Sequence, residues 1–314
     1  MEYAQKMGLG VGGGIVNPGK NILVYSGIAS DARDLMERFG IDDYNGETLI
    51  FADIDTAVGA CTASRGDKIY VAPGHTETIS SATALALDVA GISIIGIGEG
   101  SKVPTITLDT ADTATIAVSV ADVVIENVIF SANFADIASL FTLTTAKNFT
   151  LRRCQFKATA TNMNFLTLVT AGATANAADG LTFEDCSWVE PDTATSTMIT
   201  LAGDLDGLTV KGCYLNLGVN TSDLPAIAIV ATGKDVTNVH IEDNDVIRLN
   251  DANPLLITAD TTTANTGIVK NNRVRHLDTA SELLVTAGTN IGFFDNKATA
   301  VIDKSGYLLP AADS

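Results

Sequence analysis

A short pattern of apolar and polar positions recurs seven times along the chain. In each copy an apolar residue stands three positions before an Asn or Cys, which we call the anchor, and another stands two positions after it. The copies begin with Val124–Ile129, and the last one ends at Ala298. Their anchors are Asn127, Cys154, Cys186, Cys213, Asn244, Asn272 and Asn296, which lie 27, 32, 27, 31, 28 and 24 positions apart. Self-similarity at a period of about 20–50 residues indicates a stacked repeat architecture.

Apolar residues two positions apart predict that each copy is a strand, because alternate side chains of a strand share one face. One such strand per repeat predicts an all-β fold, a single-stranded parallel β-helix, in which like residues of successive coils stack about 4.8 Å apart. A second strand follows in each coil. Its expected inward pairs are Leu85/Leu87, Ile116/Val118, Phe141/Leu143, Leu166/Leu168, Ile199/Leu201, Ile227/Ile229, Leu255/Ile257 and Leu283/Val285. Eight pairs predict about eight coils.

The two ends of the chain differ from the repeats. Residues 1–29 are rich in Gly and are expected to form an extended arm. Residues 30–64 are expected to form a helical cap, with Ser30 as N-cap of a helix that stops at Gly40 and a second short helix over Ile54–Cys61. Such a cap covers the open end of a solenoid. The solenoid is expected over residues 65–300 and a C-terminal tail over residues 301–314.

The outward positions of the two strands have opposite characters. Two positions before the anchors the charge alternates in sign, through Arg152, Glu184, Lys211, Glu242 and Lys270. Stacked opposite charges attract one another, so this face is expected to meet water. Outward positions of the second strand are almost uncharged, and Val169, Val230, Leu256 and Leu284 are expected among them. An apolar outward face predicts a buried interface, most simply between three solenoids about a threefold axis.

Charge and composition narrow the range of partners. The 314 residues carry a formal net charge of −18, which argues against nucleic acid or an anionic membrane as the main partner. Only 18% of residues are charged, which on a narrow solenoid favours contact with another protein. We find no secretory signal pattern at Met1–Lys6 and no apolar run long enough to span a membrane.

Three of the four Cys residues are anchors, and we interpret them as a stack of small buried thiols. Their spacing fits neither a disulfide framework nor a zinc motif. The fourth, Cys61, precedes the repeats and has no identifiable partner.

The start of the repeats has the strongest likeness to a known family. Residues Gly66 to Gly74 read Gly-Asp-Lys-Ile-Tyr-Val-Ala-Pro-Gly, and residues 92–100 add an Ile-x-Ile-x-Gly strand. This stretch resembles the first coil of the pectin-lyase-like superfamily of right-handed β-helices, and the resemblance extends over about residues 50–300. That superfamily includes lyases, hydrolases, esterases, adhesins, phage tailspikes and other virion proteins. The resemblance therefore implies a fold and leaves the function open.

The best candidate for chemistry is a group of acids, Glu242, Asp243 and Asp245, with Arg248 nearby and His276 one coil on. Paired acids could hydrolyse glycosides, and three of them around a turn could bind calcium. Glu242 already belongs to the alternating charges, however, and Asp243 is expected at a corner, as are Asp185 and Asp295. His75, His240 and His276 fall in different coils, and no nucleophile or phosphate-binding motif occurs.

These observations favour a structural protein without catalytic, cofactor or metal site residues. We expect a trimeric capsid decoration or cement protein of a phage, assembled in the host cytoplasm and attached through its N-terminal arm to other virion proteins such as the major capsid protein. The virion placement follows from the resemblance. Two alternatives stay open: a tailspike-type or secreted polysaccharide-degrading enzyme with Asp243 and Asp245 as its acids, and a surface adhesin or S-layer-like module.

Overall fold

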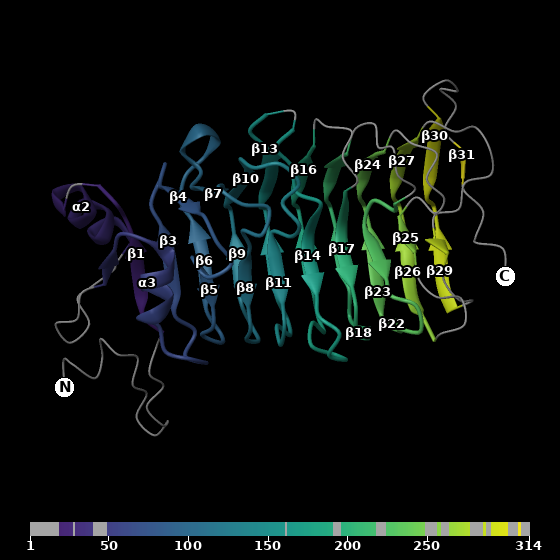
Figure 1. The fold of residues 1–314 in the computed structure, drawn as a ribbon, viewed down its shortest axis with the longest axis horizontal. Coiled ribbons are helices and arrows are strands. Elements are labelled where there is room, and N and C mark those ends of the chain that lie inside the picture. The colour runs from purple at the N-terminus through teal and green to yellow at the C-terminus, as the bar shows by residue number, and fades with distance from the viewer. Residues whose placement is uncertain are drawn as a thin grey trace.

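The computed structural model describes residues 19–27, 29–39, 49–160, 162–190, 196–217, 224–248, 256–258, 264–276, 285–286, 290–300 and 307–308. Within them the chain winds into a parallel β-solenoid of about eight coils, as the repeat predicts (Figure 1). Each full coil contributes one strand to each of three long sheets, so the cross-section has three faces.

Sheet A holds the strands that precede the anchors. In spatial order its strands are β2 (Ile50–Phe51), β1 (Asn21–Val24), β3 (Lys68–Val71), β6 (Ser93–Gly96), β9 (Val124–Glu126), β12 (Thr150–Arg152), β15 (Thr182–Glu184), β19 (Thr209–Lys211), β23 (Val239–Glu242), β26 (Thr266–Lys270) and β29 (Asn290–Phe294). All of its pairings are parallel, as in a solenoid in which each strand meets the same strand of the next coil.

Sheet B holds the strands that follow the anchors. They are β4 (Thr76–Ile79), β7 (Thr105–Leu108), β10 (Ile129–Ala132), β13 (Gln155–Ala158), β16 (Ser187–Val189), β20 (Tyr214–Asn216), β24 (Asp245–Ile247), β27 (Arg273–His276) and β30 (Lys297–Ala300). Strand β31 (Tyr307–Leu308) pairs antiparallel with β30, so the part of the expected tail that the structure describes is a strand.

Sheet C holds β5 (Ala86–Leu87), β8 (Ile116–Val118), β11 (Phe141–Leu143), β14 (Thr167–Ala171), β17 (Thr197–Leu201), β21 (Ala228–Val230), β25 (Ile257–Thr258) and β28 (Val285–Thr286). A small separate pair, β18 (Leu205–Asp206) and β22 (Val236–Thr237), lies between sheets C and A in the chain. One 3-10 turn, η1 (Gly100–Lys102), connects β6 to β7.

The interior is filled by stacked apolar side chains of like type. Phe130, Phe156 and Trp188 occupy one register column of sheet B, and all three are buried. The rings of Phe130 and Phe156 are stacked with centroids 5.8 Å apart. Burying a side chain of this size stabilises the fold by about 1.5–3 kcal/mol. The core is therefore a continuous column that neighbouring coils complete for one another.

The register corrects the predicted first copy by one residue. Ile125 pairs with Leu151, and Phe130 pairs with Phe156, so Val128 occupies the anchor position that we assigned to Asn127. Asn127 instead stands at the corner between sheets A and B with a φ of 56°. It donates from Nδ2 to the carbonyl oxygens of Gly96 and Gly98, at 2.8 and 3.1 Å. Asn adopts this left-handed conformation more readily than most residues, which suits it to the corner.

The same corner has a left-handed residue in each later coil, namely Arg153, Asp185, Gly212, Asp243, Asn271 and Asp295. The expectation that Asp185, Asp243 and Asp295 are corner residues is confirmed. The sequence alone does not distinguish the two registers of the first copy, because Val124-Ile125 and Val128-Ile129 are adjacent apolar pairs and an alternating pattern fits either member of each pair.

The expected inward pairs of sheet C also need correction. Phe141 pairs with Val169 and Leu143 with Ala171, so Val169 and Ala171 point into the core in place of the predicted Leu166/Leu168 pair. Two coils further along the solenoid, Ala228 and Val230 point inward and Ile229 points outward. Val169, Val230 and Leu256 are all buried within the chain. They therefore do not belong to an outward apolar face, while Leu284 lies outside the described residues.

The N-terminal region joins the solenoid earlier than predicted. Strand β1 lies between β2 and β3 in sheet A, so the described part of the expected arm contains a core strand. Helix α2 (Ala29–Phe39) begins one residue before Ser30, which is therefore not its N-cap. Helix α3 (Ile54–Gly59) has Asp53 as its N-cap and packs against β1, β2, β3 and β5. It covers the open end of the core (Figure 1).

Three carboxylates attach this cap to the first coils. Asp67 accepts backbone N–H groups from Lys20 and Thr62 at 2.6 and 2.7 Å, and Arg65 binds it through Nε and Nη2. Burial alone would raise the pKa of Asp67, but these hydrogen bonds outweigh it and hold the pKa below its ordinary value. Glu77 accepts the Ile54 N–H, and Asp55 accepts the Ala86 N–H of β5.

Candidate functional site

The acidic group singled out from the sequence does not converge on one surface. Glu242 lies on the outer face of sheet A, Asp243 stands at the left-handed corner, and Asp245 lies on the outer face of sheet B. Arg248 points into the interior and is fully buried. The side chain of His276 lies outside the described residues. Alternation along the strand therefore separates residues that are close in sequence.

Each of the three acids is engaged by a side chain of a neighbouring coil. Glu242 pairs with Lys211 at 2.9 Å and with Lys270 at 2.7 Å. Hydrogen bonds from Lys270 and then Lys211 hold the pKa of Glu242 below its ordinary value.

Asp243 and Asp245 are each contacted from the following coil. Asp243 Oδ1 accepts a hydrogen bond from Asn271 Nδ2 at 3.2 Å, and Asp245 pairs with Arg273 at 2.7 Å. All three carboxylates thus serve contacts between successive coils.

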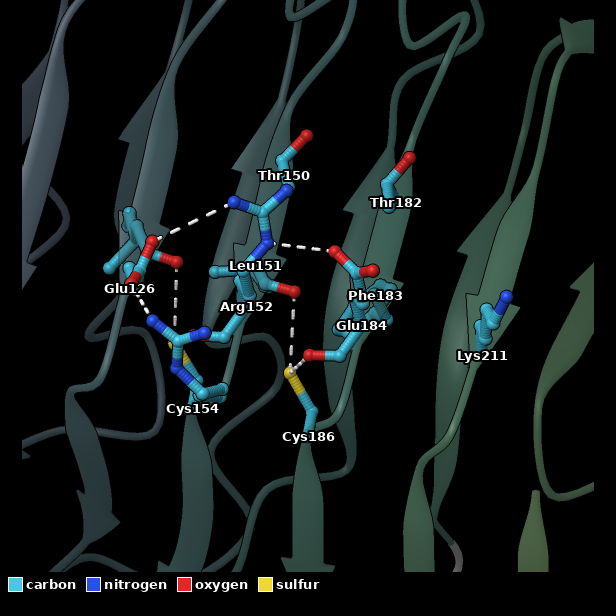
Figure 2. Close-up of polar contacts among 12 residues, drawn as sticks. Glu126, Thr150, Leu151, Arg152, Cys154, Thr182, Phe183, Glu184, Cys186 and Lys211 are labelled. Carbon is cyan, nitrogen blue, oxygen red and sulfur yellow. Dashed lines mark hydrogen bonds and ion pairs between the residues drawn. The ribbon is translucent and has the colours of Figure 1, made fainter. Parts of the chain in front are cut away.

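The predicted alternation of charge along sheet A is confirmed. Arg152 pairs in register with Glu184, Glu184 with Lys211, and Glu242 with Lys270. Figure 2 shows Arg152 between two acids, with Nε 2.7 Å from Glu184 and Nη1 3.7 Å from Glu126. Arg153, at the corner, also pairs with Glu126. The sequence pattern missed Glu126 because the first copy was read one residue out of register.

The anchors form a second ladder inside the core. Each Asn anchor donates from Nδ2 to the carbonyl of the residue three before the preceding anchor: Asn244 to Val210, Asn272 to Ile241 and Asn296 to Val269, at 2.9, 2.9 and 2.7 Å. The thiols of Cys154, Cys186 and Cys213 donate to the matching carbonyls of Ile125, Leu151 and Phe183, at 3.6, 3.4 and 3.9 Å. Cys and Asn therefore occupy equivalent positions because both donate along the coil axis.

The amide anchors make additional bonds that the thiols do not. Asn272 Oδ1 accepts both the backbone N–H and the Nδ2 of Asn244, at 3.1 and 2.9 Å, and Asn296 Oδ1 does the same for Asn272. The expected stack of buried thiols is confirmed, and all four cysteines are free. Burial, followed by contact with Cys186, raises the pKa of Cys154 well above its ordinary value, so this thiol stays protonated.

The buried guanidinium of Arg248 is bound by a backbone carbonyl in the interior. Its Nη1 donates to the carbonyl of Ser196 at 2.7 Å, two coils back along the axis. Burial lowers the pKa of Arg248 to about 10, which leaves the guanidinium charged at neutral pH. It ties coils together and is closed to solvent, so it cannot assist a reaction at Asp243 or Asp245 on the outside.

The remaining candidates are dispersed as well. His75 is buried beside Glu77 under the cap, with Nε2 3.4 Å from Glu77 Oε2, and His240 is exposed on sheet A. Cys61 donates to the carbonyl of Ala57 within the cap, and burial raises its pKa to about 12. Among the described residues no three His, Cys, Asp or Glu side chains are grouped as around a metal ion, and no helix there is long and apolar enough to cross a membrane.

Comparison with known proteins adds little to these observations. No protein-family model matches the chain, and no curated protein matches its sequence. Among solved structures it is similar to one titled "Geobacillus virus E2 - ORF18", at 11% sequence identity and a TM-score of 0.40. The match covers 78% of this chain and 57% of that one, so the chain spans little more than half the length of that protein. A likeness this distant assigns neither a family nor a function.

Proposed function

We propose that this chain is a non-enzymatic structural protein of a phage particle, a capsid decoration or cement protein that acts as a trimer of β-solenoids. The observation that carries the proposal is that the charged side chains on the outer faces pair with side chains of the neighbouring coils. On sheet A and at Asp243 and Asp245, acids and bases engage the neighbouring coil, so the carboxylates that would serve a reaction hold the stack together instead. The assignment to a virion rests on the resemblance of Gly66–Gly74 to a superfamily that includes virion proteins.

Sheet C is the face that we propose for the trimer contact. Val169, Val230 and Leu256 lie in the core, so the outer surface of sheet C is formed by one register column. Its residues are half-buried and uncharged: Ala86, Ala117, Thr142, Thr170, Thr200 and Ile229. None of these side chains is charged and all but Ile229 are small, so they leave a flat surface on which another solenoid can pack closely. The charged ladder of sheet A would then face water.

The experiment tests the oligomer and the contact face together. Mass photometry at micromolar concentration is expected to give a particle of about 98 kDa, three times the 32.6 kDa of one chain. Thr200→Arg places a bulky charge in the outward column of sheet C and is expected to give monomers. Thr182→Arg is the matched control, because Thr182 is an outward, half-buried threonine on sheet A. It is expected to leave the trimer intact.

Three results would overturn the proposal. A wild-type chain that is monomeric at micromolar concentration, or a Thr200→Arg variant that stays trimeric, removes the sheet C contact. Release of reducing sugar or unsaturated uronate from a polysaccharide panel, abolished by Asp243→Ala, establishes an enzyme instead.

Attachment to the particle needs a separate measurement. Deleting residues 1–18 keeps strand β1 in place, and the variant is expected to stay trimeric while no longer sedimenting with capsids of the virus that encodes it. Unchanged sedimentation would remove the role proposed for the N-terminal arm.

A further inference from the structure

The outer face of sheet B near its C-terminal end differs from the other two faces. Its side chains stand in two register columns, one through Tyr214, Asp245, Arg273 and Lys297 and the other through Val189, Asn216, Ile247 and Arg275. Strands β24, β27 and β30 lie next to one another there (Figure 1). We call Val189, Tyr214, Ile247, Arg273, Arg275 and Lys297 the sheet B patch.

The first half of the patch is apolar and exposed. Val189 and Tyr214 retain 42% and 39% of their accessible surface, and they are two of the three large apolar residues that are exposed in the described part of the chain. They are diagonal neighbours on β16 and β20, and Ile247, one strand further, is half-buried. Exposed apolar side chains that adjoin one another mark interaction surfaces more often than single ones do.

The second half of the patch is cationic. Arg275 and Lys297 are exposed and make no ion pair within the described residues, whereas Arg152, Lys211 and Lys270 on sheet A are all paired. Arg273 pairs with Asp245 and remains 71% exposed. Asp243 and Asp295 at the bordering corner offset part of this charge. Arg275, in the second column, lies farther from that corner. The chain as a whole has a net charge of −18, so a group of exposed cations contrasts with the charge of the molecule.

The spacing of the cations fits an extended polypeptide. Arg273 and Arg275 stand two residues apart on one strand, which is about 6.6 Å, and the same distance separates acidic side chains at alternate positions of a partner strand. Ile247 lies in register with Arg275 on the neighbouring strand, and Tyr214 lies one strand beyond Ile247, so both would bury apolar side chains of the same segment. Tyr and Arg are, with Trp, enriched among the residues that contribute most of the binding energy at protein interfaces. A glycan would gain less, because its sugar rings stack on aromatic faces and Tyr214 is the single aromatic residue of the patch.

We propose that the sheet B patch binds an extended acidic segment of a partner protein that lies along β24 and β27. Its carboxylates, at alternate positions on one side, contact Arg273, Arg275 and Lys297, and the intervening apolar residues, on its other side, contact Ile247 and Tyr214. This inference does not depend on the trimer or on the phage assignment. The three cations supply steering and specificity, and the apolar half supplies the buried contact.

The test uses the full chain and a fluorescein-labelled peptide in which Glu alternates with Val over eight residues, followed by anisotropy in 50 mM NaCl. The wild type is expected to bind saturably. Arg275→Glu/Lys297→Glu is expected to weaken binding at least about tenfold, and Tyr214→Ser by about fivefold or more. Lys68→Glu is the matched control, because Lys68 is an exposed cation on sheet A, away from the patch, and makes no ion pair within the described residues. It should change binding less than about twofold.

Several outcomes would overturn the proposal. Binding that survives Arg275→Glu/Lys297→Glu shows that these cations do not form the site. Binding that Lys68→Glu weakens equally shows attraction to charge alone. No saturable binding by the wild type up to millimolar peptide removes the site. Tighter binding of polygalacturonate, lost in the same double variant, identifies an acidic glycan in place of a protein. Thermal melts of each variant confirm that the solenoid is folded in every comparison.

Discussion

Replacing Asn272 with Ala tests whether the anchor ladder holds the coils together. Asn272 is fully buried and takes part in four hydrogen bonds through its side chain. Ala removes all four. It also leaves the backbone N–H of Asn244 and the carbonyl of Ile241 without these partners in a dry interior.

The expected loss follows from ordinary hydrogen-bond energies. A buried hydrogen bond contributes about 1 kcal/mol net, and a buried polar group left unpaired costs about 1–3 kcal/mol. Because the same groups enter both terms, we expect Asn272→Ala to destabilise the fold by about 3–5 kcal/mol. The matched change Cys213→Ala removes the weak thiol contacts to the carbonyls of Phe183 and Lys211, at 3.9 and 3.4 Å, and a small volume, which should cost about 1–2 kcal/mol.

Urea unfolding measures the two variants side by side. Far-UV circular dichroism follows the sheets, and the fluorescence of Trp188 follows the core, because Trp188 is the chain's single tryptophan and is fully buried. Equal losses below about 1 kcal/mol in both variants would refute the reasoning, since amide and thiol anchors would then be equivalent fillers. A larger loss for Cys213→Ala than for Asn272→Ala would refute it as well.

Two further predictions concern charge. Asp67→Asn should lower the melting temperature at pH 7, because the folded pKa of Asp67 lies below the unfolded value of about 3.9. The ionised carboxylate therefore stabilises the fold above the unfolded pKa, and this stabilisation is lost as the pH falls through the folded pKa. Melting curves from pH 7 to pH 3 should therefore converge for variant and wild type, and a constant difference would contradict this. Glu242→Lys places three cations in adjacent coils with Lys211 and Lys270, and it should lower the urea midpoint in 50 mM NaCl more than Glu242→Gln does. The excess should vanish in 0.5 M NaCl, and an excess that persists would show a steric cause.

The repeat was readable from the sequence because one residue type returns to one place in every coil. The column from Cys154 to Asn296 and the alternation from Arg152 to Lys270 both follow from that return, and the structure confirms them. The first copy was not readable, since Val124-Ile125 offers two apolar choices and only pairing with Leu151 selects one. With the register of the first copy ambiguous, the sequence pattern also does not identify Glu126 as part of the charged ladder or Asn127 as a corner residue.

Adjacent apolar residues make the alternating pattern ambiguous in sheet C as well. Leu168 and Val169 are adjacent and both buried, so alternation alone assigns neither to the outside. Val169, Val230 and Leu256, which the sequence predicts to point outward, are therefore core residues. The polar positions at the cap were missed for another reason: Asp67 contacts Lys20, which is 47 positions away, and such a contact has no local pattern.

The direction of the anchor ladder bears on how the chain is synthesised. Asn272 Oδ1 receives the backbone N–H of Asn244, and Asn296 Oδ1 receives that of Asn272, so an earlier coil is completed only by the coil that follows it. A ribosome releases coils in that same order. Each newly synthesised coil can therefore pack on the coil before it, and only the last anchor synthesised then has a backbone N–H without its acceptor.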